Sequence, residues 1–341
     1  MPWTKLVADD YNTSKIKNGC RLISYGEAIK EALTIAMEMD KSVLVLGEGI
    51  DAAGYAYETT GGLSDKFGKI RVIETPIAEQ LITGISLGLS IVGIRPVLIH
   101  MRNDFLLVSM DQIVNHINHW KTIFGNDTPL VIRAVIARGW GSGAQHAQSF
   151  HALFSMFEGI DVVMPYSAYD AKGMLLKAIA SNRPVLFLEH RWLYNDKSHV
   201  PEEPYFVNID RAKILSEGTD LTIIAMSIGN RYVEKASDRL KNENISVEHI
   251  DIVSTNPIDI GTLLKSVKKT KRLIIVENGP ICMGVNSEIA KKIYDQLYKE
   301  LLSPIEVIGW KGSTIPSGTK LEEKFYFTED EIVNKAKEML E

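Results

Sequence analysis

Short apolar runs alternate with amphipathic stretches along most of the chain, from about residue 23 onward. The runs have the length of buried β-strands, and the stretches between them repeat apolar residues at helical spacing. In the first half, strands are expected at residues 42–47, 71–74, 96–100, 130–135, 161–165 and 185–189. Helices are expected there at residues 24–39, 77–91, 109–124 and 168–180. Such alternation indicates the α/β class, with a mostly parallel sheet flanked by helices on both faces.

A second α/β series follows a charged, proline-containing stretch at residues 194–208, which has the composition of a linker. Its expected strands are at residues 220–226, 246–252 and 272–276. Its expected helices are at residues 231–241, 259–267, 284–301 and 328–340. A length of 341 residues also exceeds one typical core. We therefore predict two domains, at residues 19–205 and 206–341, after a polar N-terminal arm at residues 1–18.

Composition narrows the function classes. The apolar fraction of 45% and a net charge of −5, with no dense Lys/Arg stripe, are typical of a globular protein that binds no nucleic acid. No stretch approaches the ~20 apolar residues of a membrane-spanning helix, and the N-terminus has no signal-peptide core. Cys20 and Cys282 form no CxxC or metal-type pair. The expected location is therefore the cytoplasm.

Glu79 is the first residue whose position suggests chemistry. The sequence RVIETPIAEQ (71–80) ends a predicted strand and begins a helix. This point lies at the carboxyl edge of the expected sheet, where α/β folds place ligands. A carboxylate in a first helical turn also stabilises the helix dipole. The local pattern alone leaves both interpretations of Glu79 open.

A series of collinear motifs carries a resemblance that goes further. They are LGEG (46–49), KFGKIRVIETPIAEQ (66–80), GIRPVL (93–98), GAQHAQS (143–149), VLFLEHRWLY (185–194) and IVENGPICMGVNSEIA (275–290). With them the chain resembles the beta subunit of the decarboxylating component of 2-oxo acid dehydrogenases, of the pyruvate, branched-chain and acetoin types. This resemblance implies the transketolase pyrimidine-binding domain followed by the transketolase C-terminal domain.

The resemblance also implies a thiamine diphosphate site. In this family the glutamate that matches Glu79 hydrogen-bonds N1′ of the aminopyrimidine, which activates the cofactor. Phe105 matches an aromatic residue that stacks on the pyrimidine ring. Ile77 matches an apolar residue that packs on the cofactor, and Glu48 matches a position close to it, although either could instead be part of the scaffold. Met101 is assigned to the same site, although it stands where the family more often has glutamine.

His146 matches a histidine that the family uses at the substrate end of the site. Imidazole suits proton relay because it can donate or accept near neutral pH. Residues 139–143 just before it contain three glycines, which let a backbone approach a ligand closely. We predict His146 and Glu79 as the catalytic residues. His151 stands where the family is often acidic, and the sequence leaves open whether it has a function.

The chain lacks the GDG motif with which thiamine diphosphate enzymes usually hold Mg²⁺ and the diphosphate. It also lacks a P-loop, and its GWGSG stretch has no acidic metal ligand. We predict no metal ligand in this chain. By the resemblance, an alpha subunit supplies the Mg²⁺ and diphosphate site, typically in an α2β2 heterotetramer.

The predicted function is decarboxylation of a 2-oxo acid and transfer of the acyl group to a lipoyl acceptor, with a lipoyl acyltransferase core as a further candidate partner. Departures near the site, such as Arg102 where the family more often has phenylalanine, keep an alternative open. That alternative is a split transketolase-like or acyloin-forming thiamine enzyme with an aldehyde or sugar acceptor. A non-catalytic subunit that retains the fold is the third hypothesis.

Overall fold

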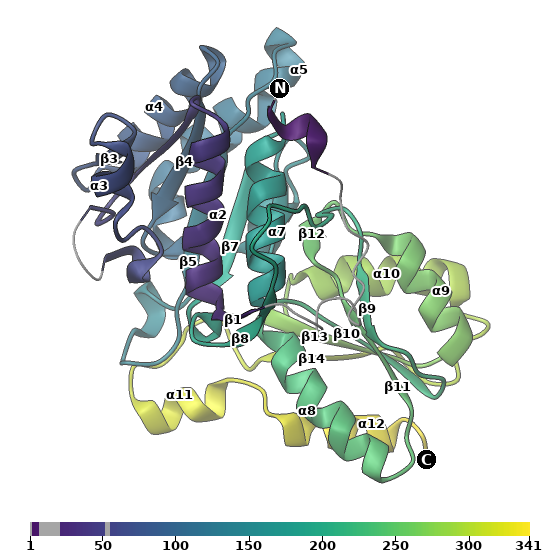
Figure 1. Ribbon diagram of the computed structural model, residues 1–341. Helices are drawn as coiled ribbons and strands as arrows, with labels where there is room; N and C mark the ends of the chain where they lie inside the picture. The colour runs from purple at the N-terminus through teal and green to yellow at the C-terminus, as the bar shows by residue number, and fades with distance from the viewer. Residues whose placement is uncertain (1, 7–20, 52–54) are drawn as a thin grey trace. The chain divides into compact units, whose positions relative to one another are not determined.

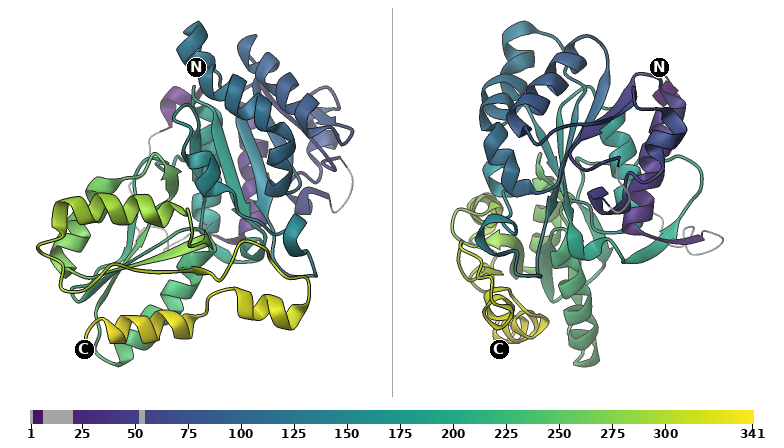
Figure 2. Two further views of the ribbon diagram at one scale, coloured as in Figure 1. Left: turned by 180° about the vertical axis from the view of Figure 1, so that it is seen from behind. Right: turned by 90° about the vertical axis from the view of Figure 1, so that its left-hand side faces the viewer.

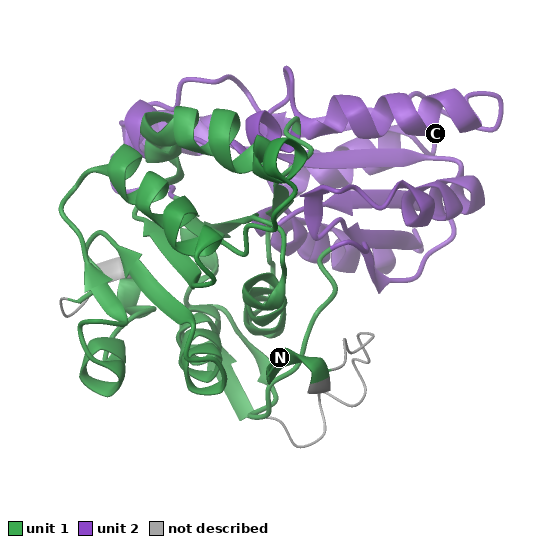
Figure 3. Cartoon of the chain, turned by 90° about the horizontal axis from the view of Figure 1, so that it is seen from above, with its two compact units in different colours: residues 1–136, 156–209 green, residues 137–155, 210–341 purple. Residues whose placement is uncertain are grey.

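The structure is a computed structural model that describes residues 2–6, 21–51 and 55–341. The chain forms two compact units (Figures 1 and 3). Unit 1 comprises residues 1–136 and 156–209, and unit 2 comprises residues 137–155 and 210–341. The predicted polar arm lies partly outside the described residues. Cys20 lies outside them.

Unit 1 contains a parallel sheet with strand order β6-β7-β5-β4-β2-β3. Its strands are β2 (Val43–Gly47), β3 (Val72–Glu74), β4 (Arg95–His100), β5 (Val131–Ile136), β6 (Asp161–Val163) and β7 (Val185–His190). Each lies on or within two residues of a predicted strand. Strands β4, β5 and β7 are buried along their whole length, as expected of a sheet covered on both faces.

Helices cover both faces of this sheet, with α2 and α7 on one face and α4 and α5 on the other (Figure 2, right). They are α2 (Tyr25–Met39), α4 (Glu79–Ile91), α5 (Asn118–Phe124) and α7 (Ala168–Ala180), with a short α3 (Leu63–Phe67). Ser24 caps α2 in a capping box with Glu27, so the helix begins where the sequence predicts.

The predicted helix at residues 109–124 has a different local winding. A 3₁₀ segment, η3 (Asn103–Ser109), leads into a π-helical segment, η4 (Asp111–Ile117), and only α5 is a regular α-helix. Shorter 3₁₀ segments in unit 1 are η1 (Pro2–Lys5), η2 (Tyr55–Glu58) and η6 (Arg191–Leu193). The sequence pattern locates the helical stretch because apolar spacing reports which face is buried, but it does not resolve hydrogen-bond period.

The prediction of a linker at residues 194–208 was wrong. Strand β8 (Lys197–Val200) pairs antiparallel with β1 (Arg21–Ser24). The Tyr205 ring stacks on Tyr169 of α7 at 4.5 Å, and its hydroxyl donates to the Tyr169 carbonyl. Lys172 of α7 is fully buried and donates to the backbone of this segment. Charges and prolines suggested a solvated connection, whereas the aromatic ring and the strand pairing make it part of unit 1.

Unit 2 is a second α/β layer structure with strand order β14-β13-β10-β11-β9. Its strands are β9 (Lys213–Ser216), β10 (Leu221–Ala225), β11 (Val247–Asp251), β13 (Leu273–Pro280) and β14 (Glu306–Trp310), with a short β12 (Ser254–Asn256). Its helices are α6 (His151–Ser155), α8 (Ile228–Asn242), α9 (Ile260–Thr270), α10 (Val285–Leu297), α11 (Thr319–Phe325) and α12 (Glu329–Glu338), with a 3₁₀ segment η5 (Gly143–Gln145). Only β9 runs antiparallel to its neighbour in this sheet. Helices α8 and α12 pack together on one side of the sheet, and α9 and α10 pack together.

The units divide the chain differently from the predicted domains at one place. The change at residues 209 and 210 lies close to the predicted boundary. Residues 137–155, however, group with unit 2 although the prediction put them in the first domain. Among the described residues, no helix has the length and apolar character needed to cross a membrane.

Candidate cofactor site

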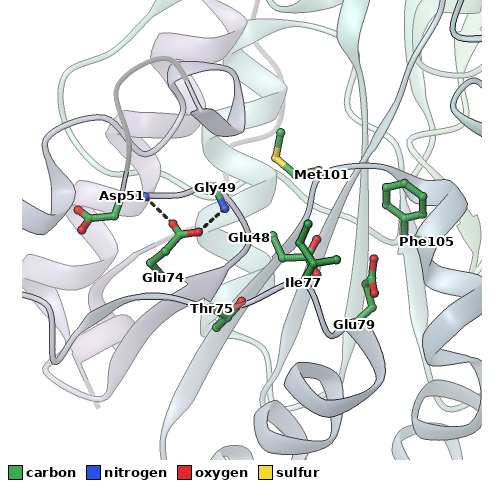
Figure 4. Close-up of a pocket in the computed structure, with 9 residues that line it drawn as sticks. All are labelled: Glu48, Gly49, Asp51, Glu74, Thr75, Ile77, Glu79, Met101 and Phe105. Carbon is green, nitrogen blue, oxygen red and sulfur yellow. Dashed lines mark hydrogen bonds between the residues drawn. The ribbon is translucent and has the colours of Figure 1, made fainter.

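A cavity of about 770 Å³ opens in unit 1 at the carboxyl ends of β2, β3 and β4. Its lining residues are Glu48, Gly49, Asp51, Glu74, Thr75, Ile77, Glu79, Met101 and Phe105 (Figure 4). The carboxyl edge of a parallel sheet is the usual ligand site of α/β folds. All five residues predicted to contact a cofactor in unit 1 therefore line one cavity.

Glu79 is the first residue of α4 and is only 8% exposed. Its carboxyl points toward the space between Ile77 and Phe105 (Figure 4). The Thr83 hydroxyl lies 2.7 Å from the Glu79 carbonyl oxygen and 3.0 Å from Ser109 Oγ. These contacts tie the first turn of α4 to η3, so the elements that carry Glu79 and Phe105 are held together.

Glu48 is a second buried carboxyl in the cavity. Its Oε1 atom is buried and has no hydrogen-bond partner. Burial, and then the neighbouring Glu79, raise the pKa of Glu48 from 4.5 to about 7. A buried carboxyl oxygen without a partner is costly unless a ligand supplies a hydrogen-bond donor. This orphaned oxygen and the Glu79 carboxyl fit a ligand that presents ring nitrogens or an amino group.

Glu74, at the end of β3, holds the loop that follows Glu48. Its carboxylate accepts hydrogen bonds from the backbone N–H groups of Gly49, at 2.6 Å, Ile50, at 2.6 Å, and Asp51, at 2.9 Å. Three such donors fix the loop and with it the Glu48 backbone. The sequence analysis missed this role. A glutamate at a strand end within the RVIETPIAEQ sequence was the available signal, but its partners lie more than 20 residues away.

The apolar part of the cavity consists of Ile77, Met101 and Phe105. Ile77 is 82% exposed, so its side chain is open to a ligand in the cavity. Flat or apolar side chains beside two buried carboxyls suit a planar heteroaromatic ring. The residues present therefore fit the aminopyrimidine part of thiamine diphosphate.

His146 lies in unit 2, directly after η5, and is exposed. It is not among the residues that line the unit 1 cavity. Within the described ranges of the chain, no three His, Cys, Asp or Glu side chains are arranged to hold a metal ion.

Comparison with known proteins places this geometry in a family. Residues 21–197 match the transketolase pyrimidine-binding domain, and residues 210–332 match the transketolase C-terminal domain. The pyruvate dehydrogenase E1 component subunit beta of Porphyra purpurea is 35% identical over 92% of this chain and 96% of its own length. That of Rickettsia felis is 36% identical over 93% of this chain and 98% of its own. The chain belongs to this family of E1 beta subunits.

Two further relatives show the breadth of the family. The beta subunit of an acetoin:2,6-dichlorophenolindophenol oxidoreductase of Bacillus subtilis is 34% identical over 94% of this chain and 98% of its own length. A solved structure titled as an inactive β4 tetramer of a split-gene transketolase has a TM-score of 0.75 at 25% identity and covers 93% of this chain and 98% of its own. The predicted E1 beta family and its transketolase-like fold are confirmed.

Proposed function

We propose that the chain is the beta subunit of a thiamine-diphosphate-dependent 2-oxo acid dehydrogenase, acting with an alpha subunit and transferring the acyl group to a lipoyl acceptor. The observation that carries the proposal is the cavity in which Glu48, Ile77, Glu79, Met101 and Phe105 meet. The family membership supports the same reaction class.

Each residue has a defined task in this proposal. When bound, thiamine diphosphate supplies the carbanion chemistry of decarboxylation. Glu79 holds a proton against N1′ of the pyrimidine, and Phe105 and Ile77 orient the ring and exclude water. The unpartnered oxygen of Glu48 accepts a second hydrogen bond from the ligand. His146 handles protons at the substrate end, the role that the family resemblance gives it.

An apolar rim beside the cavity supports a partner chain. Leu81, Ile85 and Val92 of or next to α4 are 59%, 46% and 75% exposed. Leu107 and Val108 of η3, which packs against α4, are 41% and 55% exposed. Several exposed apolar side chains on two elements that pack together favour a protein interface. We propose that the alpha subunit covers this rim and brings the Mg²⁺ and diphosphate site, in an α2β2 assembly.

The direct test uses the reconstituted complex of this chain with the partner that carries the GDG motif. The assay is 2-oxo acid-dependent reduction of ferricyanide. Glu79→Gln keeps the shape of the side chain but removes the acidic proton, so turnover should fall by at least 10²-fold, the range typical of general acid–base catalysis. Glu38→Gln makes the same chemical change at an exposed position of α2 paired with Lys66 and should leave turnover unchanged.

Three outcomes separate the hypotheses. Full activity of the Glu79→Gln complex would refute the catalytic assignment. Turnover with a sugar or aldehyde acceptor but none with lipoamide would favour the split transketolase hypothesis. The likeness to the β4 split-gene transketolase is the observation behind that alternative. Failure of the chain to support any thiamine-dependent turnover with its partner would favour a non-catalytic subunit.

A further inference from the structure

The segment of residues 137–155 carries His146 and belongs to unit 2 (Figure 3, purple). A glycine-rich segment has a large conformational entropy and needs tethers to hold a side chain in one place. The C-terminal part of the chain supplies such tethers at three points along the segment.

The first tether holds the beginning of the segment. The Arg138 guanidinium lies 3.8 Å from the ring centroid of Tyr326 and donates to the Tyr232 hydroxyl at 2.8 Å. The Gly139 N–H donates to the Glu322 carboxylate at 2.7 Å. A cation over an aromatic ring and a charge-assisted hydrogen bond are both among the stronger polar contacts.

The second tether is a close approach in the middle of the segment. Gly143 has φ +60°, and a Cβ atom there would lie 2.2 Å from Ser317 Oγ. A larger residue there would be strained, because L side chains rarely adopt this φ and the Ser317 side chain would have to move. The backbone three residues before His146 is therefore packed closely against the chain that leads into α11.

The third tether is a series of buried, hydrogen-bonded side chains that begins just after His146. The Ser149 hydroxyl lies 2.8 Å from His151 Nδ1, and His151 Nε2 lies 2.5 Å from Glu277 Oε1. Glu277 Oε2 accepts from the backbone N–H of Asn286 at 3.0 Å and from its side-chain amide at 3.1 Å. His151 and Glu277 are both fully buried, and Gly279 of β13 lies against the imidazole ring.

The hydrogen bonds fix the charge of Glu277. Its Oε2 atom accepts both hydrogen bonds from Asn286. Burial opposes ionisation of Glu277, but His151 and Asn286 outweigh it and lower the pKa of Glu277 below its ordinary value. A carboxylate can only accept, so Nε2 of His151 donates to Glu277 Oε1. Glu277, His151 and Ser149 therefore form one connected series of hydrogen bonds.

We propose that Glu277, acting through His151 and Ser149, is a positioning residue for His146. Ser149 follows His146 by only three residues, so displacement of the Ser149 tether moves the His146 backbone. This inference rests on the proposed role of His146. It deepens that role by assigning the placement of the substrate-end histidine to the C-terminal domain. A misplacement of about 1 Å at a reacting group can cost about 10²-fold in rate.

The first measurement needs no partner and no cofactor. Amide hydrogen exchange of the peptide at residues 139–150 should become at least tenfold faster in Glu277→Ala, while strands β10 and β11 keep their protection. Glu248→Ala is the matched control: Glu248 is also a buried carboxylate of unit 2, but its partners include Lys269 and the Gly218 N–H, outside the segment. Unchanged exchange at 139–150 in Glu277→Ala would overturn the proposal.

The second measurement is a double-mutant cycle in the reconstituted complex, with acylation of lipoamide as the readout. Glu277→Ala should lower the transfer rate by about 10²-fold and leave the affinity for thiamine diphosphate unchanged. In a His146→Ala background, the same substitution should lower it by less than about threefold, because interacting sites are non-additive. Equal losses in both backgrounds would contradict action through His146 and indicate a merely structural role.

Two further comparisons keep the result interpretable. If Glu277→Ala does not fold, Glu277→Gln serves instead, because glutamine keeps the shape and one acceptor oxygen and should show the same non-additivity with a smaller loss. If the Glu79→Gln complex is fully active, the proposed function fails, and the exchange measurement still tests the tether alone.

Discussion

Arg133 and Glu189 offer a quantitative test of how unit 1 is held together. They lie on the neighbouring central strands β5 and β7, and both side chains are essentially inaccessible, at 1% and 0% exposure. The guanidinium donates to both carboxylate oxygens, with Nε to Oε1 at 2.5 Å and Nη2 to Oε2 at 2.9 Å. Arg133 also donates to Thr59, and the Tyr194 hydroxyl donates to Glu189 at 2.6 Å.

Removing one member of the Arg133–Glu189 ion pair should lower the free energy of unfolding by far more than the intact pair adds to it. Arg133→Met leaves Glu189 buried with only the Tyr194 hydroxyl as donor. Breaking a buried ion pair in this way costs about 3–5 kcal/mol, because a charge remains uncompensated. Small domains have a free energy of unfolding of about 5–15 kcal/mol, so the single variant should be severely destabilised. The double variant Arg133→Met, Glu189→Gln removes the orphaned charge and should recover about 2 kcal/mol or more of this loss.

The assay is urea unfolding followed by circular dichroism, with hydrogen exchange of β5 and β7 to show that the transition belongs to unit 1. Lys66→Met is the control. Lys66 pairs with Glu38 on the surface, so its loss should change the free energy of unfolding by less than about 1 kcal/mol. A loss below about 1 kcal/mol for Arg133→Met, or a double variant less stable than it, would refute the reasoning.

Two other variants test the site and the sheet. The pKa of Glu48 is about 7 in the folded state against 4.5 for an ordinary glutamate, so between these pH values the folded state holds a proton that the unfolded state releases. The free energy of unfolding should therefore fall as pH rises from 4.5 through 7. Glu48→Gln should therefore be more stable than the wild type at pH 7.5 and gain nothing at pH 4, as urea titrations at both pH values would show; equal gains at both would contradict the assignment. Arg95 donates to the carbonyls of Ile179, at 3.0 Å, and Ser181, at 2.7 Å, at the end of α7, so Arg95→Ala should lower the free energy of unfolding by about 1.5–3 kcal/mol. Arg95→Lys should recover only part of this loss because lysine lacks the fork of donors, and full stability of Arg95→Ala would show that water replaces the contacts.

The sheet of unit 1 could be predicted from the sequence for a clear physical reason, whereas the pocket residues were predicted from the family motifs. Buried parallel strands appear as continuous apolar runs, and residues directly after such runs gather at one sheet edge. Glu48, Glu79 and Met101 each lie next to a strand end or a helix start, so order along the chain nearly fixes their place. Their chemical meaning came from the family motifs, since Glu79 alone had an equally good explanation as a helix-dipole residue.

The tethers of residues 137–155 could not be predicted in the same way. His151 and Glu277 are 126 residues apart, and each stands in a pattern with an ordinary local explanation. The linker prediction failed for a related reason. In the sequence, Tyr205 looks like an isolated aromatic residue among prolines and charges. In the structure, its ring centroid lies 4.5 Å from that of Tyr169. Composition describes an average environment, whereas these contacts depend on specific pairs.

The residues proposed for the cofactor and the histidine proposed for the substrate also differ in the structural elements that position them. Glu79 and Phe105 are carried by regular or helical elements of unit 1, tied together through Thr83 and Ser109. His146 is carried by a glycine-rich segment whose position depends on side chains of unit 2. Substitutions in the C-terminal domain should therefore alter substrate steps while sparing cofactor binding, and substitutions around Thr83 should alter the binding and activation of the cofactor. A variant such as Glu322→Gln, which weakens the Gly139 tether, should lower acyl transfer and leave the affinity for thiamine diphosphate unchanged; a loss of cofactor affinity in that variant would contradict this division of roles.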